Sequence, residues 1–245
     1  MAISIPYLNP VSAEGEPLAM PIVLFDDFLD GRSHTPNNAS IASGQGKFSE
    51  LANLGDWLVT LVDGGGDNGE VIRVADDGVG GHLTLTTNDA DDDSIEIQMN
   101  GEAWQAASGK TLIFEARIKG ADVSEFDWFV GLAITDTTVM TACTDRIGFE
   151  CPDSTGDIDA ISEKDSTQTT TDSAKDLADD TFVVLRFEVH GTSKVKYYVD
   201  GALVATHSST TLPEDEALTP TICVRNDGAA ANTMTVDYVL VVRER

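Results

Sequence analysis

The chain has 245 residues, with 42 acidic and 15 basic side chains, so its formal net charge at pH 7 is -27. A charge of this size repels nucleic acids and anionic membrane surfaces, and we therefore expect neither as a partner. No run approaches the roughly 18 apolar residues that a membrane helix needs, while the length suits one all-β domain with a full-sized core.

Residues 1–22 are expected to form an extended arm. Pro6, Pro10, Pro17 and Pro21 lie here, and each fixes φ and interrupts a helix or a central strand. The apolar side chains between them favour packing against a neighbouring subunit, and a closed homotrimer is the expected assembly; a disordered terminus is the alternative. Because the segment lacks the basic region and unbroken apolar stretch of a secretory signal, we expect synthesis in the cytoplasm.

From Val23 onward the chain is a succession of short strand-like runs separated by turn residues. In "FVVLRFEVH", the side chains of Val183, Leu185, Phe187 and Val189 fall on one face and the polar ones on the other. This alternation is typical of an antiparallel sheet with one buried face. Similar runs are "WLVTLV", "HLTLTT", "SIEIQM", "TLIFEARI", "WFVGLAI", "TICVR" and "TVDYVLVV". Many short strands at turn-separated intervals predict a two-sheet sandwich.

Two hairpins are predicted in the second half of the chain. "KVKYYVDGALVATH", from Lys194 to His207, has Asp200-Gly201 between two alternating runs, which is the signal of a two-residue type I′ turn. Within the acidic stretch from Pro152 to Thr181, "IDAISEKD" followed by "STQTTTD" predicts a polar hairpin on an outer edge, since threonine suits a solvated strand.

The order of three motifs carries a resemblance. "LFDDFLDG", "YYVDGALVATH" and "MTVDYVLVV" resemble the opening strand, penultimate hairpin and closing strand of concanavalin A-like jelly-roll sandwiches. "SGKTLIFEARIKGADVSEFDWFVGLAITDTT", "DRIGFE" and "AISEKDSTQTTTDSAKDLADDTFV" resemble structural proteins of tailed bacteriophage virions. That resemblance implies a capsid-decorating or fibre-like module and no catalytic residues.

A laminarinase-like glycosidase is the enzymatic alternative with the same fold. A retaining glycosidase needs two carboxyl groups about 5 Å apart, and this family places them in a Glu-x-Asp pattern with a second Glu two or three residues on. "EFDWFVG" offers Glu125 and Asp127, but Phe129 and Val130 stand where the second Glu belongs. "SIEIQMN" offers one glutamate, Glu96, followed only by amides at alternate positions, Gln98 and Asn100. Both clusters are incomplete, so we assign no catalytic residue.

Acidic turns suggest calcium, and two positions are candidates. Asp89, Asp91 and Asp93 have the spacing of an EF-hand loop, but Ser94 replaces the glycine and the bidentate glutamate is missing. Asp237 in the closing strand lies where laminarinase-like sandwiches hold a calcium ligand. A solvated carboxylate explains each position, so no metal is assigned.

Other ligand-binding residue types give weak signals. The odd number of cysteines, Cys143, Cys151 and Cys223, predicts reduced thiols rather than a disulfide framework. The four histidines are scattered, which leaves a zinc site without support. Three tryptophans adjoin apolar runs and are expected in the core, although a sugar-stacking groove is the alternative; they are Trp57, Trp104 and Trp128.

The sequence therefore predicts an all-β, concanavalin A-like jelly-roll sandwich over residues 23–245, preceded by the arm of residues 1–22. The predicted function is a non-enzymatic virion protein that decorates the capsid exterior, bound to the major capsid protein and to itself, without cofactor or metal. A lectin-like, glycan-binding adhesion module and a laminarinase-like glycoside hydrolase are the two alternatives.

Overall fold

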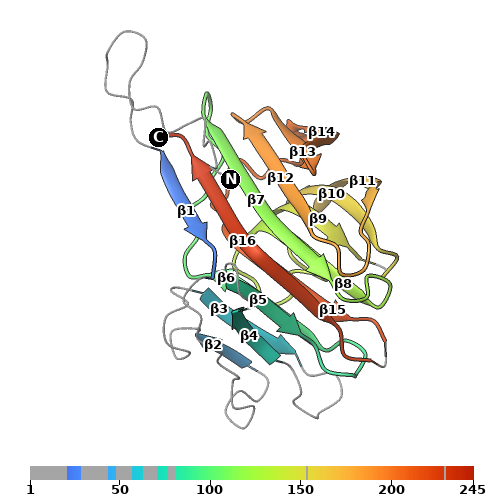
Figure 1. The fold of residues 1–245 in the computed structure, drawn as a ribbon. Helices are drawn as coiled ribbons and strands as arrows, with labels where there is room; N and C mark the ends of the chain where they lie inside the picture. The colour runs from blue at the N-terminus through green and yellow to red at the C-terminus, as the bar shows by residue number, and fades with distance from the viewer. Residues whose placement is uncertain are drawn as a thin grey trace.

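The structure is a computed structural model, and it describes residues 21–28, 44–47, 57–62, 71–76, 81–152, 154–228 and 230–245. The predicted arm lies outside these ranges, apart from its last two residues. Two antiparallel sheets face each other and form a sandwich (Figure 1). The prediction of an all-β jelly-roll sandwich is confirmed.

The first sheet has β16 near its centre, with β1 (Ile22–Asp26) paired to the end of that strand. The other strands, in order across the sheet, are β14 (Ala202–Ser208), β13 (Lys194–Val199), β12 (Val183–His190), β7 (Thr111–Gly120), β16 (Thr233–Arg243), β5 (Gly81–Thr86) and β4 (Val71–Asp76).

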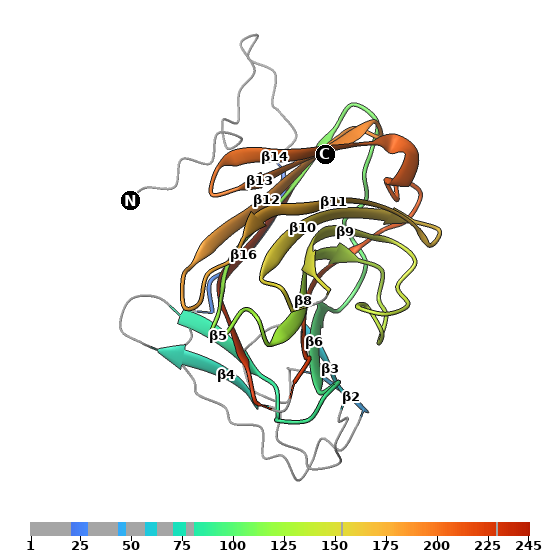
Figure 2. The same ribbon diagram turned by 90° about the vertical axis from the view of Figure 1, so that its right-hand side faces the viewer.

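The second sheet has β8 and β15 at its centre. Its order is β11 (Thr167–Asp176), β10 (Asp157–Lys164), β9 (Arg146–Cys151), β8 (Phe126–Ala133), β15 (Thr219–Asn226), β6 (Ser94–Met99), β3 (Trp57–Val62) and β2 (Gly44–Lys47). Figure 2 shows this sheet curving, with its hollow side turned away from the first sheet.

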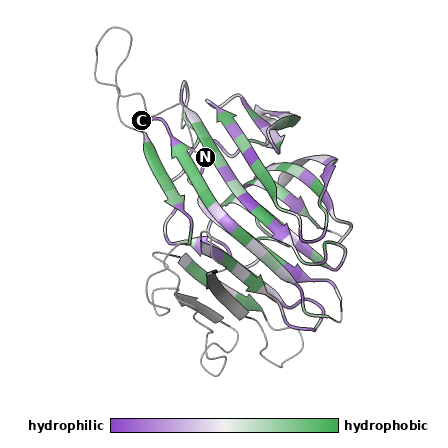
Figure 3. Cartoon of the chain, viewed as in Figure 1, coloured by the Kyte–Doolittle hydropathy of each residue, from purple (hydrophilic) through white to green (hydrophobic). Residues whose placement is uncertain are grey.

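The main core lies between the two sheets and is built by alternate residues of each strand. In β12, the predicted apolar face is the buried one, and the side chains between its members are only half-buried. Figure 3 shows the resulting alternation of hydrophobic and hydrophilic residues along β7, β12 and β16. The largest side chains that are fully buried in this core include Phe114, Phe126, Trp128, Phe149, Phe187 and Tyr197.

Both predicted hairpins are present. β13 and β14 are joined through Asp200 and Gly201, whose φ angles of 49° and 79° are the left-handed values that a type I′ turn requires. β10 and β11 form the polar hairpin at the edge of the second sheet, and its turn uses Asp165 and Ser166 at φ 49° and 62°. The register of this hairpin shifts between Ile158 and Ala160, which marks a β-bulge.

A buried polar cluster joins the edges of the two sheets. His207 of β14 contacts Ser162 of β10 through Nδ1 at 2.9 Å and Thr171 of β11 through Nε2 at 3.0 Å. The Ser162 hydroxyl also lies 2.8 Å from that of Thr211, which donates to Thr169. Hydrogen bonds therefore satisfy these polar groups inside an otherwise apolar sandwich.

Candidate functional site

The outer face of the second sheet, the face turned away from the main core, gathers most of the buried charge in the described residues. One row of paired residues crosses it from β6 to β10: Glu96, Cys223, Phe129, Glu150 and Asp159. Alternation along the strands adds two more carboxylates, so the acidic residues of this face are Glu96, Asp127, Glu150, Asp159 and Glu163.

Asp127 lies on β8, a central strand of the sheet, and its negative charge is compensated by partners within the protein. Its carboxylate pairs with Arg225 of β15 and accepts hydrogen bonds from the backbone N–H and the hydroxyl of Ser154, both at 3.0 Å. Burial raises the pKa of Asp127, against the opposing effect of Arg225. Glu125, its partner in the sequence motif, is exposed and precedes the strand, so the structure does not bring this pair together on one strand face.

Phe129 occupies the next outer position on β8, where the glycosidase pattern requires a second carboxylate. Gly131 and Gly148 form a pair between β8 and β9, and a Cβ on Gly148 would lie 2.9 Å from Cε2 of the Phe129 ring. A Cβ on Gly131 would lie 2.2 Å from the carbonyl oxygen of Ile147. The two glycines therefore let the strands approach closely and leave room for the aromatic ring.

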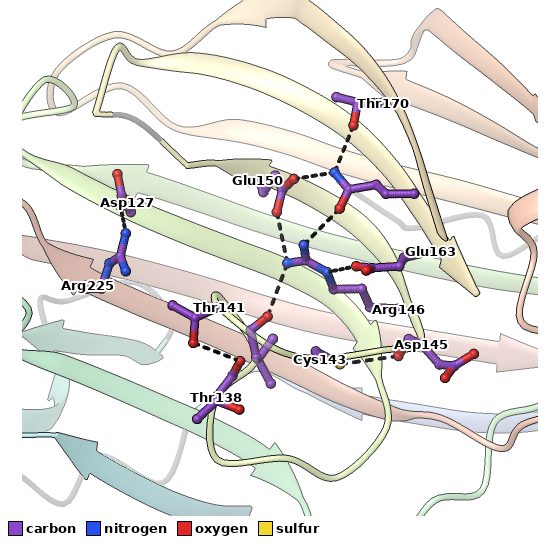
Figure 4. Close-up of polar contacts among 12 residues, drawn as sticks. Asp127, Thr138, Thr141, Cys143, Asp145, Arg146, Glu150, Glu163, Thr170 and Arg225 are labelled. Carbon is purple, nitrogen blue, oxygen red and sulfur yellow. Dashed lines mark hydrogen bonds and ion pairs between the residues drawn. The ribbon is translucent and has the colours of Figure 1, made fainter. Parts of the chain in front are cut away.

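Arg146 of β9 holds the carboxylates on the other side of the face (Figure 4). Its guanidinium lies 2.7 Å from Glu163 and 2.9 Å from Glu150, and it donates to the side-chain oxygen of Gln168 at 3.0 Å. Burial raises the pKa of Glu150, and the Arg146 charge opposes that shift. The arginine and its two glutamates are nearly inaccessible to solvent, so each charge depends on the others.

Glu96 of β6 has no arginine or lysine partner in the described part of the chain. It is 4% exposed; Oε2 accepts the backbone N–H of Val139 at 3.2 Å, and Oε1 has no hydrogen-bond partner among the described residues. Burial raises its pKa from 4.5 to about 7, and the charge of Asp136 adds to the shift. A carboxyl group with such a pKa exchanges its proton near neutrality, as a general acid or base does.

Residues 134–145, which we call the cover loop, connect β8 to β9 and fold back over this face. Val139 and Cys143 of the loop are buried in a small apolar cluster with Phe129, Ile161 and Cys223. This cluster is separate from the main core, because the second sheet lies between the two. The middle of the face is therefore covered by the protein's own chain.

The remaining candidate residues are buried in the core or make contacts within the protein's own fold. The three tryptophans are buried and belong to the core cluster, as expected, so they offer no sugar-stacking platform. Asp93 accepts the backbone N–H of Ala90 at 3.0 Å, and Asp237 pairs with Arg117 at 2.5 Å and His82 at 3.4 Å. No group of three potential metal ligands occurs among the described residues.

The cysteines are free thiols, as predicted, and all three are buried. Burial raises the pKa of Cys143 to about 11 and raises that of Cys223 as well. In the described ranges, no helix has the length and apolar character of a membrane span.

Sequence reasoning missed the importance of Glu96, because it looked for a second acid along the same strand. The partners of Glu96 come from β15 and from the cover loop, and neither is near it in sequence. The available signal was its alternation with Ile95 and Ile97, which turns Glu96 to the face opposite the core.

Comparisons with known proteins identify the fold. No protein-family model and no curated protein matches the sequence. Among solved structures, SCLam, a non-specific endo-β-1,3(4)-glucanase from family GH16, has a TM-score of 0.59 at 16% identity and covers 94% of each chain. An endo-1,3-β-glucanase from Streptomyces sioyaensis has a TM-score of 0.58 at 14% identity, over 90% of this chain and 95% of its own. A protein of unknown function from Shewanella oneidensis has a TM-score of 0.55 at 17% identity, over 84% and 89%.

These comparisons correct the predicted function. The glucanases share the fold over nine-tenths of the chain or more, and nothing found points to a bacteriophage. The prediction of a non-enzymatic virion protein that decorates a capsid is therefore wrong, and the enzymatic alternative has the better support. The error has a physical reason, since the motifs behind it consist of core and turn residues, which determine a fold rather than a role. The fold itself is established: the chain is a concanavalin A-like jelly roll of the kind found in β-glucanases.

Proposed function

We propose that the protein is a glycoside hydrolase that acts on β-linked glucans, with its site on the outer face of the second sheet. The observation that carries the proposal is Glu96, a buried carboxyl group with a pKa of about 7 on a face that holds four further carboxylates. Perturbed carboxyl groups gathered on one surface are a mark of acid and base catalysis. The names of the structural neighbours, endo-glucanases, supply the substrate class.

Glu96 is the proposed general acid. Near and below neutral pH its proton is available to the glycosidic oxygen, so that the leaving sugar departs as an alcohol. Asp127, whose carboxylate pairs with Arg225, is the proposed general base that takes a proton from the attacking water. The two residues lie two strands apart, which is about 10 Å, and Asp127 lies two residues, or about 7 Å, along β8 from Phe129, the residue in line with Glu96, so their Cα atoms are about 12 Å apart. This separation is too large for the roughly 5 Å of a retaining pair, and it fits an inverting mechanism, which leaves room for water between its carboxyl groups, when the two side chains lean toward each other.

Sugar release from β-1,3-glucan and from mixed-linkage β-1,3-1,4-glucan tests the proposal. We expect the purified protein to release reducing sugars, and Glu96→Gln to abolish the release while it leaves the fold intact. Glu125→Gln is the matched control, because Glu125 is exposed and precedes the strand, and its activity should equal that of the parent. Absence of released sugar with both glucans would contradict the proposal.

A second candidate is a lectin-like module that binds glucan without cleaving it. Phe129 favours this candidate, because it puts an aromatic ring where the family pattern calls for a carboxylate. Retention of the protein on insoluble β-1,3-glucan, without any sugar released, would support this candidate over the hydrolase.

A further inference from the structure

The cover loop is held on the outer face through its own main chain. The Val139 N–H donates to Glu96 at 3.2 Å, and the Val139 carbonyl accepts from Arg146 at 3.2 Å. Gln98 uses both ends of its amide in the same way: Nε2 donates to the Ile134 carbonyl at 2.9 Å, and Oε1 accepts the Asp136 N–H at 3.0 Å. Three side chains from β6 and β9 are thus satisfied by backbone groups that any hydroxyl-rich ligand could replace.

Little apolar surface fastens the loop. Val139 and Cys143 are its buried apolar members, and Ile134 and Met140 pack half-buried against the same cluster; Asp145 is also buried, whereas Thr135, Thr137 and Thr141 are exposed. Adjacent antiparallel strands such as β8 and β9 can be joined by a two-residue turn, so the topology does not need a connection of this length. These two buried and two half-buried apolar side chains keep less surface from water than a strand of the main core does, so the loop can open while the sandwich stays folded.

Sugar chains have the groups that would satisfy the uncovered face. Their hydroxyls both donate and accept hydrogen bonds, as the loop backbone does towards Glu96, Gln98 and Arg146. The C–H face of a glucose ring packs on aromatic rings, and Phe129 lies beneath Val139 in the same apolar cluster. The covered surface thus pairs one aromatic ring with polar groups on either side, an arrangement suited to an extended glycan.

We propose that the cover loop is a displaceable, self-inhibiting segment and that a β-glucan chain binds in its place, on Glu96, Gln98, Phe129 and Arg146. This inference rests on the proposed function, since it takes its ligand class from there. Ligand and loop compete for one surface, so the apparent association constant equals the intrinsic association constant multiplied by the fraction of molecules whose loop is open.

The three thiols report on the loop without any activity measurement. Cys143 lies in the cover loop, Cys223 lies beneath it on β15, and Cys151 lies in the main core between the sheets. Opening of the loop exposes the first two and leaves the third covered, whereas global unfolding exposes all three. Alkylation by N-ethylmaleimide, located by peptide mass spectrometry, measures each thiol separately.

The first experiment adds a β-1,3-linked glucose hexasaccharide to the parent protein. We expect saturating hexasaccharide to accelerate alkylation of Cys143, which leaves with the displaced loop, and to slow alkylation of Cys223, which the sugar then covers. Slower alkylation at both thiols would mean that the sugar binds elsewhere and stabilises the closed loop, and this result would overturn the inference.

The second experiment weakens the closed state with Val139→Ala, which removes two buried methyl groups from the contact between the loop and the outer face. We expect alkylation of Cys143 and Cys223 to accelerate roughly tenfold, with Cys151 unchanged. The affinity for the hexasaccharide, measured by calorimetry, should rise by the same factor. Thr137→Ala, at an exposed position of the same loop, is the matched control and should change neither quantity.

Four results contradict the inference in different ways. Faster alkylation without a gain in affinity means that the ligand does not bind beneath the loop. A parallel rise at Cys151 means that the loop does not open as a separate unit. If neither protein binds or cleaves the sugar, the proposed function and this site fall together, whereas binding that slows both thiols removes only the site beneath the loop.

Discussion

Glu96 differs from the other buried carboxylates of the outer face in what opposes its charge. Asp127 is paired with Arg225, and Glu150 with Arg146, but Glu96 has only one backbone N–H. In a buried site, a single neutral donor compensates less of the lost hydration than a guanidinium does. The carboxyl group therefore keeps its proton to higher pH, and its surroundings depend on whether the cover loop is in place.

The raised pKa of Glu96 predicts a pH-dependent stability. The folded protein binds this proton more tightly than the unfolded chain does, so the contribution of Glu96 to stability is greatest below pH 4.5 and falls as the pH rises to about 7. Relative to Glu96→Gln, which stays neutral, the parent should lose on the order of 3 kcal/mol of unfolding free energy across this window. Urea titrations at several pH values measure the difference; a constant difference would contradict the shift.

Arg146 is predicted to matter more for stability than an arginine near the surface. Arg146→Met leaves Glu150 and Glu163 buried without their counter-charge, and the loss should be on the order of 3–5 kcal/mol at neutral pH. Arg186→Met is the control, because Arg186 is 32% exposed on the first sheet and its ion pairs should contribute under about 1 kcal/mol. Equal losses in the two variants, measured by urea unfolding, would contradict this ranking.

At the scale of elements, the edges of the two sheets are joined by His207 with Ser162 and Thr171. Burial lowers the pKa of His207, because the imidazolium would lose its hydration between the strands. The neutral ring suits the observed contacts, since one nitrogen donates and the other accepts.

This junction should weaken in acid. A histidine whose folded pKa is lowered stabilises the fold above its unfolded value near 6.5, and that stabilisation is lost as the pH falls through the folded pKa. Between pH 7 and 5, the protection factors for hydrogen exchange, which are corrected for the intrinsic pH dependence of exchange, should fall in β11 and β14 before they fall in β7 or β16. His207→Gln should remove this dependence on pH, and an unchanged profile would show that another group is responsible.

The strands were predictable from the sequence, and the outer face was not. The β13–β14 hairpin is specified by Asp200-Gly201 and by alternation, both of which are local. The polar β10–β11 hairpin also followed from local composition. The contacts of Glu96 and Arg146 join β6, β9 and the cover loop, and they depend on strand order and on how residues 134–145 fold back. Neither the strand order nor the path of residues 134–145 leaves a periodic pattern in the sequence, so residue spacing cannot reveal these contacts.

At the scale of the whole molecule, charge opposes compactness. With 42 acidic and 15 basic residues, the folded surface concentrates negative charge that the unfolded chain spreads out. The melting temperature should therefore rise by a few degrees when sodium chloride increases from about 0.01 M to about 0.3 M, because screening shortens the reach of the repulsion. A fall in melting temperature over this range would mean that surface ion pairs outweigh the repulsion.

The homotrimer stays a prediction that concerns the arm. If the arm ties subunits together, the full-length protein should scatter light as a trimer and a chain that begins at Val23 as a monomer. Salt should strengthen the trimer by screening its acidic surfaces. A monomer in both cases would mean that the arm does not mediate assembly.

The bulge in the β10–β11 hairpin has a consequence for crowded solutions. β11 is a terminal strand of the second sheet, and a long, regular terminal strand offers its free backbone groups to any neighbouring molecule. Here the register shift kinks the strand beside Ser173, whose backbone N–H donates to Asp159 of its own hairpin at 2.7 Å. Asp172, Lys175 and Asp176 add charge along the same segment. This edge of the sheet thereby resists pairing with a strand of another molecule, and removing the bulge would leave a regular edge strand that can pair.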